Sequence, residues 1–252
     1  GARATPRSRA RALRGAGLLA RQQAELERAR TLFDQALALY RELDDKRGLA
    51  LTLLGRGRVA FAQGEYERAR ACYDEALGLA REIAATDIVS TSLSNLGELA
   101  RVRGDYEVAR ALYQEALKTL GERNPRQRAV TLFDLGQVSL AADDSRAARG
   151  FYRDSLTTSA RLGDRSMVAN VLEGLAGVGV FQGHPERAAQ LLGAAEALRK
   201  AINAPIQPAD LPLYERTVTA GRAALGERDF VAAWNEGVEM ALEDAIAIAL
   251  GN

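Results

Sequence analysis

Apolar and small residues recur at helical spacing along most of this chain. In residues 51–83, Leu54, Gly57 and Phe61 lie three or four positions apart, as on one face of a helix. Gly64 then interrupts the pattern, as glycine does at tight turns. A second stripe with the same spacing follows: Tyr66, Ala69, Tyr73, Ala76 and Leu77. The pattern predicts a helix, a tight turn and an antiparallel helix.

The second stripe belongs to a phrase that returns every 39 or 40 residues. It reads Gly-(Glu/Asp)-Tyr-Glu-x-Ala-Arg-Ala-x-Tyr-x-Glu-Ala-Leu, with nearly complete copies at 64–77 and 104–117 and weaker copies from Ala24, Asp143 and Gly183. A fixed period of this size indicates a stack of similar helix pairs. We therefore predict an all-α fold of five antiparallel helix pairs. Such a stack has a long binding surface rather than one active-site pocket.

Small residues within each copy indicate where the helices approach each other. We expect Gly57 and Ala69 at the crossing of the two helices of a pair, because small side chains let backbones come close. Tyr73 is expected to face the next pair. Gly64 suits a turn with positive φ, whereas Ala24 and Asp143 replace it in the first and fourth copies. Those two turns are expected to differ from the others.

These small and large positions resemble the tetratricopeptide repeat over about residues 10–200. The residues that carry the resemblance in the second copy are Gly57, Gly64, Tyr66, Ala69, Tyr73 and Ala76. The resemblance implies a right-handed superhelix in which the first helix of each pair lines the concave face. The period here is about 40 rather than the 34 residues typical of the family, so the helices are expected to be longer.

The tail after the fifth copy has a different pattern. We predict five repeats over residues 1–200, a proline-containing linker over 201–212 and capping helices over 213–252. Phe230, Trp234 and Ile246 are expected to cover the apolar edge of the last repeat, because terminal repeats need a cap.

The tail blocks LLGAAEALR and LGERDFVAAWNEG also resemble the C-terminal ending of bacterial signalling ATPases of the STAND type, including MalT-like and LuxR-type regulators. That resemblance implies a cytoplasmic C-terminal fragment of a larger regulator. The nucleotide-binding motif G-x-x-x-x-G-K-[ST] does not occur in this sequence.

Composition excludes several classes of protein. The chain has 47% hydrophobic and 27% charged residues, typical of a globular protein. No run of 18 apolar residues occurs, so no membrane span is expected. The single cysteine, Cys72, excludes an internal disulfide and fits a reducing cytosol. With one histidine, His184, no zinc site built mainly on these ligands is possible.

The net charge of +1 is unevenly distributed. Residues 1–30 contain eight arginines and two glutamates, whereas residues 201–252 carry a net charge of −5. The basic end either is a solvated terminus or contacts an acidic partner. A nucleic-acid role would rest on these arginines alone, among them Arg3, with no interleaved aromatic residues, and is disfavoured.

The candidate catalytic features are weak. Gly174, Gly177, Gly179 and Gly183 miss the spacing and the preceding strand of a phosphate-binding loop, so helix packing is the better interpretation. His184 lies in a Gly-His-Pro-Glu turn with no converging acid or nucleophile. We expect no enzyme activity, no metal and no cofactor.

The tetratricopeptide resemblance implies a binding groove on the concave face. The positions that it assigns to this face are Arg21, Arg58, Phe61, Ser94, Glu98, Arg101, Phe133, Gln137, Asn170, Glu173 and Phe181. We expect Phe61 and Phe133 to anchor an apolar group, and Arg58 and Arg101 to hold a carboxylate or phosphate.

The predicted function is a non-enzymatic binding or sensor module. Its ligand would be a protein segment or a small inducer, with the upstream NTPase domain of the same protein as one candidate partner. The alternative is an architectural arm that autoinhibits or oligomerises a signalling ATPase.

Overall fold

The computed structural model describes residues 5–251, and every regular element in that range is a helix. Arg3 lies outside the described residues. The thirteen helices are α1 (Pro6–Gln22), α2 (Leu26–Glu42), α3 (Lys46–Ala62), α4 (Tyr66–Glu82), α5 (Thr86–Val102), α6 (Tyr106–Leu120), α7 (Pro125–Ala141), α8 (Ser145–Arg161), α9 (Arg165–Phe181), α10 (Pro185–Ile202), α11 (Leu211–Leu225), α12 (Glu227–Glu239) and α13 (Leu242–Leu250).

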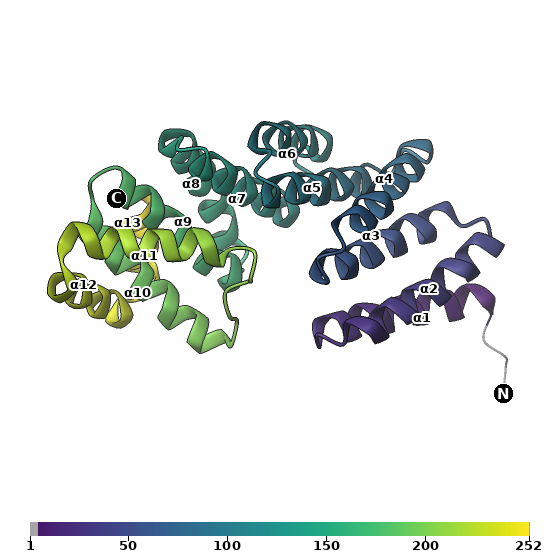
Figure 1. Ribbon diagram of the computed structural model, residues 1–252, viewed down its shortest axis with the longest axis horizontal. Coiled ribbons are helices and arrows are strands. Elements are labelled where there is room, and N and C mark those ends of the chain that lie inside the picture. Colours follow the sequence, from purple (N-terminus) through teal and green to yellow (C-terminus); the bar gives the residue numbers. More distant parts are fainter. Residues whose placement is uncertain (1–4, 252) are drawn as a thin grey trace. The chain divides into compact units, whose positions relative to one another are not determined.

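The helices belong to two compact units, residues 1–120 and 121–252. Unit 1 stacks the pairs α1/α2, α3/α4 and α5/α6 (Figure 1). Unit 2 stacks α7/α8 and α9/α10 and adds α11, α12 and α13. The predicted all-α fold of stacked antiparallel helix pairs is confirmed.

Four of the five pairs, α1/α2 to α7/α8, are held by an aromatic ring that lies on a glycine. A Cβ atom at Gly57 in α3 would lie 2.4 Å from Cε1 of Tyr73 in α4. Only glycine leaves room for the ring, since real Cβ atoms essentially never come closer than 3.0 Å to a neighbour. Ala69 is fully buried, as expected. However, the side chains facing Gly57 are Tyr73 and Cys72, so our assignment of this crossing to Gly57 and Ala69 was incomplete.

The same contact recurs in α1/α2, α5/α6 and α7/α8. An added Cβ atom would lie 2.9 Å from the ring for Gly17 with Phe33, 2.9 Å for Gly97 with Tyr113, and 2.4 Å for Gly136 with Tyr152. Two of these rings also reach the next pair, where Gly55 lies against Phe33 and Gly174 against Tyr152. These rings therefore join neighbouring pairs as well as the two helices of one pair.

Each turn inside the five pairs contains one residue in the left-handed conformation, at the same position of the repeat. Its φ is 75° at Gly64, 83° at Gly104 and 81° at Gly183. The residues that replace glycine adopt the same conformation, with φ of 60° at Ala24 and 61° at Asp143. The two turns were expected to differ from the others, but their φ angles do not differ in sign or region. A side chain in this conformation costs about 1–2 kcal/mol.

We expect Gly64→Ala to lower the free energy of unfolding by about 1 kcal/mol, because the left-handed strain exceeds the gain from a stiffer unfolded chain. Gly78→Ala is the matched control, since Gly78 is exposed inside α4 and an added Cβ atom there would meet open space. This control should raise the free energy of unfolding by roughly 0.5–1 kcal/mol. Urea denaturation measures both, and shifts of the same sign would contradict the turn assignment.

In unit 2, α12 packs on α10 with their backbones in contact. A Cβ at Gly193 would lie 2.0 Å from the carbonyl oxygen of Trp234, and a Cβ at Gly237 would lie 1.9 Å from that of Gln190. The Trp234 indole Nε1 donates to Glu196 Oε2 at 2.7 Å, and Phe230 is fully buried. These contacts place α12 over the exposed side of the last helix pair.

We expect Gly237→Ala to destabilise unit 2 by about 3 kcal/mol, the upper part of the usual range for overpacking, because a backbone carbonyl cannot move aside as a side chain can. Gly150→Ala, at an exposed position in α8 with open space around it, should be neutral or slightly stabilising. Thermal unfolding followed by circular dichroism compares the two. Equal melting temperatures would show that α10 and α12 do not cross at these glycines.

Candidate binding face

The first helices of unit 1 place a row of arginines on one side. We call the side chains Arg14, Arg21, Arg58, Glu98 and Arg101, from α1, α3 and α5, the first-helix face of unit 1. Arg14 and Arg21 lie seven residues apart, about two turns, and so share a side of α1. This face contains four of the six predicted residues of unit 1: Arg21, Arg58, Glu98 and Arg101.

Arg58 lies partly buried at the centre of this face. Its Nε donates to Asn95 Oδ1 at 3.4 Å. Burial lowers the pKa of Arg58; the neighbouring Tyr73 opposes this shift and the positive charge of Arg21 adds to it. Burial also raises the pKa of the Tyr73 hydroxyl, so the tyrosine remains neutral. Two guanidinium groups thus lie within electrostatic reach of each other.

These arginines lack carboxylate partners among the residues that the structure describes. The Nε atoms of Arg14 and Arg21 are buried without a hydrogen-bond partner there. Arg58 has no ion pair with any described acidic side chain, and its described hydrogen bond is the one to Asn95. An unsatisfied buried polar group costs about 1–3 kcal/mol, so a ligand that bonds to these groups would recover that energy.

Arg101, by contrast, has an internal partner. Its Nε and Nη2 donate to the two carboxylate oxygens of Glu98 at 2.8 and 2.7 Å. Glu98 also accepts a hydrogen bond from the Tyr113 hydroxyl at 3.1 Å. Of the two arginines predicted to hold a ligand, Arg101 is therefore neutralised within the fold, and Arg58 is not paired with a carboxylate.

The two other predicted residues of unit 1, Ser94 and Phe61, are buried and partly buried, respectively. Ser94 is buried, with 7% of its surface exposed. Phe61 is partly buried, and its ring centroid lies 5.6 Å from that of Tyr66. Phe61 therefore contributes an apolar edge rather than a fully exposed anchor.

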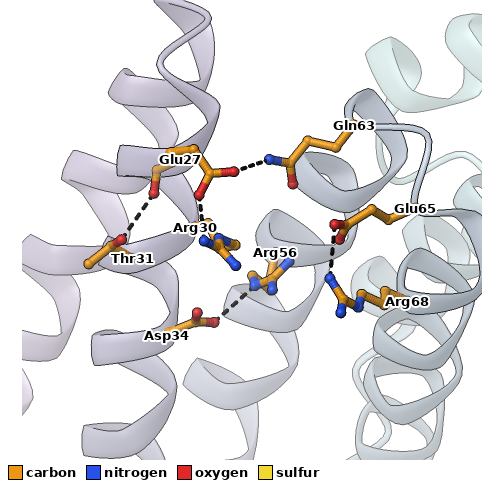
Figure 2. Close-up of polar contacts among 8 residues, drawn as sticks. All are labelled: Glu27, Arg30, Thr31, Asp34, Arg56, Gln63, Glu65 and Arg68. Carbon is orange, nitrogen blue, oxygen red and sulfur yellow. Dashed lines mark hydrogen bonds and ion pairs between the residues drawn. The ribbon is translucent and has the colours of Figure 1, made fainter.

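Away from this face, many arginines of unit 1 are paired with acidic side chains. Arg56 pairs with Asp34 at 2.9 Å, and Gln63 donates to Glu27 at 2.6 Å (Figure 2). Arg30 bonds to the same Glu27, and Arg68 pairs with Glu65 (Figure 2). Consecutive second helices are joined in the same way: Arg41 with Glu75, and Arg81 with Glu115. Within unit 1, the partly buried Arg14, Arg21 and Arg58 thus differ from these paired arginines in having no described ion pair.

In unit 2 the corresponding face is covered by the chain itself. The helix α11 packs against α9 and α10. Gln137 in α7 donates to Asp210, just before α11, at 2.8 Å, and Arg216 in α11 pairs with Asp143 at 2.7 Å. The Arg216 guanidinium also lies 4.6 Å from the ring centroid of Phe181, a cation–π contact.

This covering helix corrects the prediction for unit 2. Phe133 is only 6% exposed, and its ring packs 5.8 Å from Tyr152 beneath α11. Gln137 is 4% exposed. The space left between this face and α11 is about 20 Å³, room for roughly one water. Phe133 and Gln137 are therefore core positions, and our expectation that Phe133 is open to a ligand was wrong.

Asn170 and Glu173 hold the segment that leads into α11. Arg199 donates to both oxygens of Glu173 at 2.6 Å and to Asn170 Oδ1 at 2.7 Å. The same guanidinium donates to the Ala204 carbonyl oxygen at 3.2 Å. Burial raises the pKa of Glu173, while its bonds to Arg199 act in the opposite direction. Burial also raises the pKa of Tyr214 in α11 to about 12.

The glycines of α9 were the available signal for α11. A Cβ at Gly177 would lie 2.7 Å from Leu140 and 3.0 Å from the Thr217 hydroxyl of α11. Gly174, Gly177 and Gly179 were correctly interpreted as sites of close helix packing, whereas Gly183 is a turn residue with open space around it. The sequence did not indicate that one of their neighbours is α11, which we had predicted only as a cap.

A comparison with protein families decides the class. The family model described as "Tetratricopeptide repeat" matches residues 8–82 and 88–160. The chain belongs to the tetratricopeptide repeat family. Members of this family are generally non-catalytic scaffolds that mediate protein–protein interactions. No curated protein sequence matches this chain.

Solved structures share the fold of this tetratricopeptide protein. BtubC (BKLC) from P. vanneervenii is 22% identical, with a TM-score of 0.66 over 87% of this chain and 91% of its own. A putative kinesin light chain of P. anserina is 14% identical, with a TM-score of 0.59 over 77% of this chain and 96% of its own. PilF of Pseudomonas aeruginosa is 17% identical, with a TM-score of 0.54 over 90% and 97%. At these identities the likeness shows the fold.

Membrane spans and metal sites are two other kinds of feature that a chain of this length can carry. Over residues 5–251, no helix has the length and apolar character needed to cross a membrane. In the same range, no group of three or more histidine, cysteine, aspartate or glutamate side chains is arranged to hold a metal ion.

We expect Arg199→Leu to destabilise unit 2 by about 3–5 kcal/mol, because it leaves the Glu173 carboxylate buried without its partner. The control is Arg81→Leu, which breaks the exposed pair with Glu115 and should cost at most about 1 kcal/mol. Chemical denaturation compares them, and equal losses would contradict the buried role of Arg199.

The pH dependence supplies a second measurement on Arg199→Leu. Because burial raises the folded-state pKa of Glu173 above its unfolded value, this residue's contribution to stability is fully present below the unfolded pKa. The contribution is lost as the pH rises through the folded pKa. We expect a steeper loss in Arg199→Leu than in the parent, because the opposing bonds of Arg199 are gone. Parallel stability curves between acidic and neutral pH would contradict this account.

Proposed function

We propose that this protein binds an acidic segment of a partner protein on the first-helix face of unit 1. The observation that carries the proposal is the set of partly buried arginines Arg14, Arg21 and Arg58, which have no acidic partner among the described residues. The membership of the tetratricopeptide family supports a protein partner rather than a substrate.

The chemistry of the face favours carboxylates. Arginine forms bidentate, charge-assisted hydrogen bonds with planar carboxylates, and these bonds are about twice as strong as neutral ones. The guanidinium groups are held on helices, so little ordering is needed when a ligand binds. Two guanidinium groups close together also repel each other, and an anion between them removes that repulsion.

Unit 2 supports the choice of face. Its own first-helix positions are covered by α11 and by the residue before it: Asp210 accepts a hydrogen bond from Gln137, and Tyr214 of α11 packs, partly buried, against the core. The alternative function, an architectural arm, is favoured by this same observation, because a covered face has a structural role. We assign that role to unit 2 and the binding role to unit 1.

We also propose that this module is part of a larger bacterial regulator, because its tail resembles that of STAND-type signalling regulators. In this setting the module is a cytoplasmic sensor arm of a bacterial regulator, and the acidic segment comes from an upstream NTPase domain or from another protein. A small acidic inducer is a second ligand with the same chemistry. Sequencing the gene upstream tests the setting: an open reading frame that encodes no nucleotide-binding motif would refute it.

A displayed library of random peptides tests the binding proposal. We expect selection on the whole protein to enrich peptides with aspartate or glutamate. Arg58→Gln and Arg21→Gln should each weaken the binding of a selected peptide by about 1.5–3 kcal/mol, or roughly 10- to 100-fold, the range for hydrogen bonds to charged groups. Fluorescence anisotropy of the labelled peptide gives the affinities.

Arg41→Gln is the matched control, because it removes the same charge from an exposed position that pairs with Glu75 at 3.5 Å on the second helices. This variant should bind as the parent does. If selected peptides lack acidic residues, or if all three variants bind equally, the first-helix face of unit 1 is not the binding face.

A further inference from the structure

A second group of arginines lies far along the chain, in unit 2. Arg149 of α8 and Arg187 of α10 converge beside the carboxyl end of α13. Their Nη2 atoms lie 3.5 and 3.9 Å from the same point, the ideal Cβ position of Gly251. The two guanidinium groups therefore approach one small volume from different helices.

No carboxylate neutralises this pair among the described residues. Neither Arg149, which is exposed, nor the partly buried Arg187 takes part in any of the ion pairs found there, and the same holds for Arg146 and Arg153 of α8. The pKa of Arg187 is lowered, first by burial and then by the positive charge of Arg149. Two like charges held together without a counter-ion are unfavourable unless an anion joins them.

The space between the two arginines is a small pocket. Its walls are Leu175, Val178 and Leu191, and its polar lining includes Gln182 and His184. The cavity volume is about 60 Å³. Because a water needs about 10–15 Å³ of such volume, the pocket has room for roughly four to six water-sized groups, which is comparable to the five heavy atoms of a phosphate ion.

We propose that this pocket binds a tetrahedral oxyanion of the phosphate class between Arg149 and Arg187. The two guanidinium groups supply donors in a planar fork, the arrangement that recognises phosphate oxygens bidentately. Gln182 and His184 supply further polar groups at the rim, and the apolar wall excludes water from one side. The site lies in unit 2 and shares no residue with the first-helix face of unit 1.

The carboxyl end of α13 offers a competing role for the two arginines. A helix ends with a partial negative charge, which basic side chains stabilise. However, the described contacts include no hydrogen bond from either arginine to the last carbonyls of α13, and that partial charge offsets only part of two full positive charges. A purely structural role predicts loss of stability on mutation without any dependence on phosphate.

Isothermal titration of the whole protein with inorganic phosphate, at constant ionic strength set with sodium chloride, tests the proposal. We expect saturable binding by the parent, and at least a 10-fold loss of affinity in Arg149→Gln and in Arg187→Gln. Arg187→Lys keeps the charge but not the fork and should retain part of the affinity. The matched control is Arg146→Gln, at an exposed position on the same helix α8, which should bind as the parent does.

Titration with O-phosphoserine distinguishes a free ion from a phosphorylated side chain as the natural source. Binding of either ligand that depends on both arginines supports the site, and the tighter ligand identifies the source. No saturation at millimolar concentrations of either ligand would overturn the proposal, as would equal affinities for Arg146→Gln and Arg187→Gln. Circular dichroism of each variant confirms that it is folded before it is titrated.

Discussion

The fold depends on one contact, the aromatic ring of a second helix lying on a glycine of the first. At Gly57, Gly97 and Gly136 there is no room for a Cβ atom beneath the ring. The contact sets how closely the two helices approach, and the rings of Phe33 and Tyr152 carry that spacing on to the next pair. Because these contacts hold the stack from within, the outward-facing side of each first helix does not have to supply packing. It is free to carry polar groups such as Arg58.

Charge then distinguishes the two sides of unit 1. On the second helices, ion pairs join consecutive repeats, as Arg81 with Glu115 shows. Exposed pairs of this kind add little stability individually, but they leave few unmatched charges. On the first-helix face, Arg21 and Arg58 lack such partners, whereas Arg101 is matched by Glu98. The same residue type therefore has a structural role on one side and is available to a ligand on the other.

Much of the fold could be predicted from the sequence, because the repeat makes every signal appear several times. Periodicity gave the helix pairs, and the positive φ expected at Gly64 is observed. The prediction for the crossing at Gly57 was incomplete, since spacing alone does not tell whether a small residue faces another small residue or a ring. The ligand-binding role of Arg58 stays a prediction. The internal partner of Arg101 was not predicted, because it depends on the rotamers of Glu98 and Arg101 within one turn of α5.

That α11 covers the first-helix positions of unit 2 could not be predicted in the same way. Phe133 and Gln137 occupy the positions that the repeat assigns to a binding face, yet Asp210, Leu213 and Tyr214 cover them. These covering residues lie outside the repeat and some 70 positions away, with Gln137 and Asp210 separated by 73 residues. Only long-range packing brings them together, and a local pattern contains no information about it.

The central claim is that α11 is the resident occupant of the first-helix face of unit 2, which leaves unit 1 as the binding unit. Hydrogen exchange of the backbone amides, followed by mass spectrometry on the whole protein, tests it most directly, because exchange reports the local free energy of opening. The account predicts that residues 211–225 exchange as slowly as α9, on which α11 packs. Exchange of that segment at the rate of an open loop would contradict it, because Phe133 and Gln137 would then be available to a ligand.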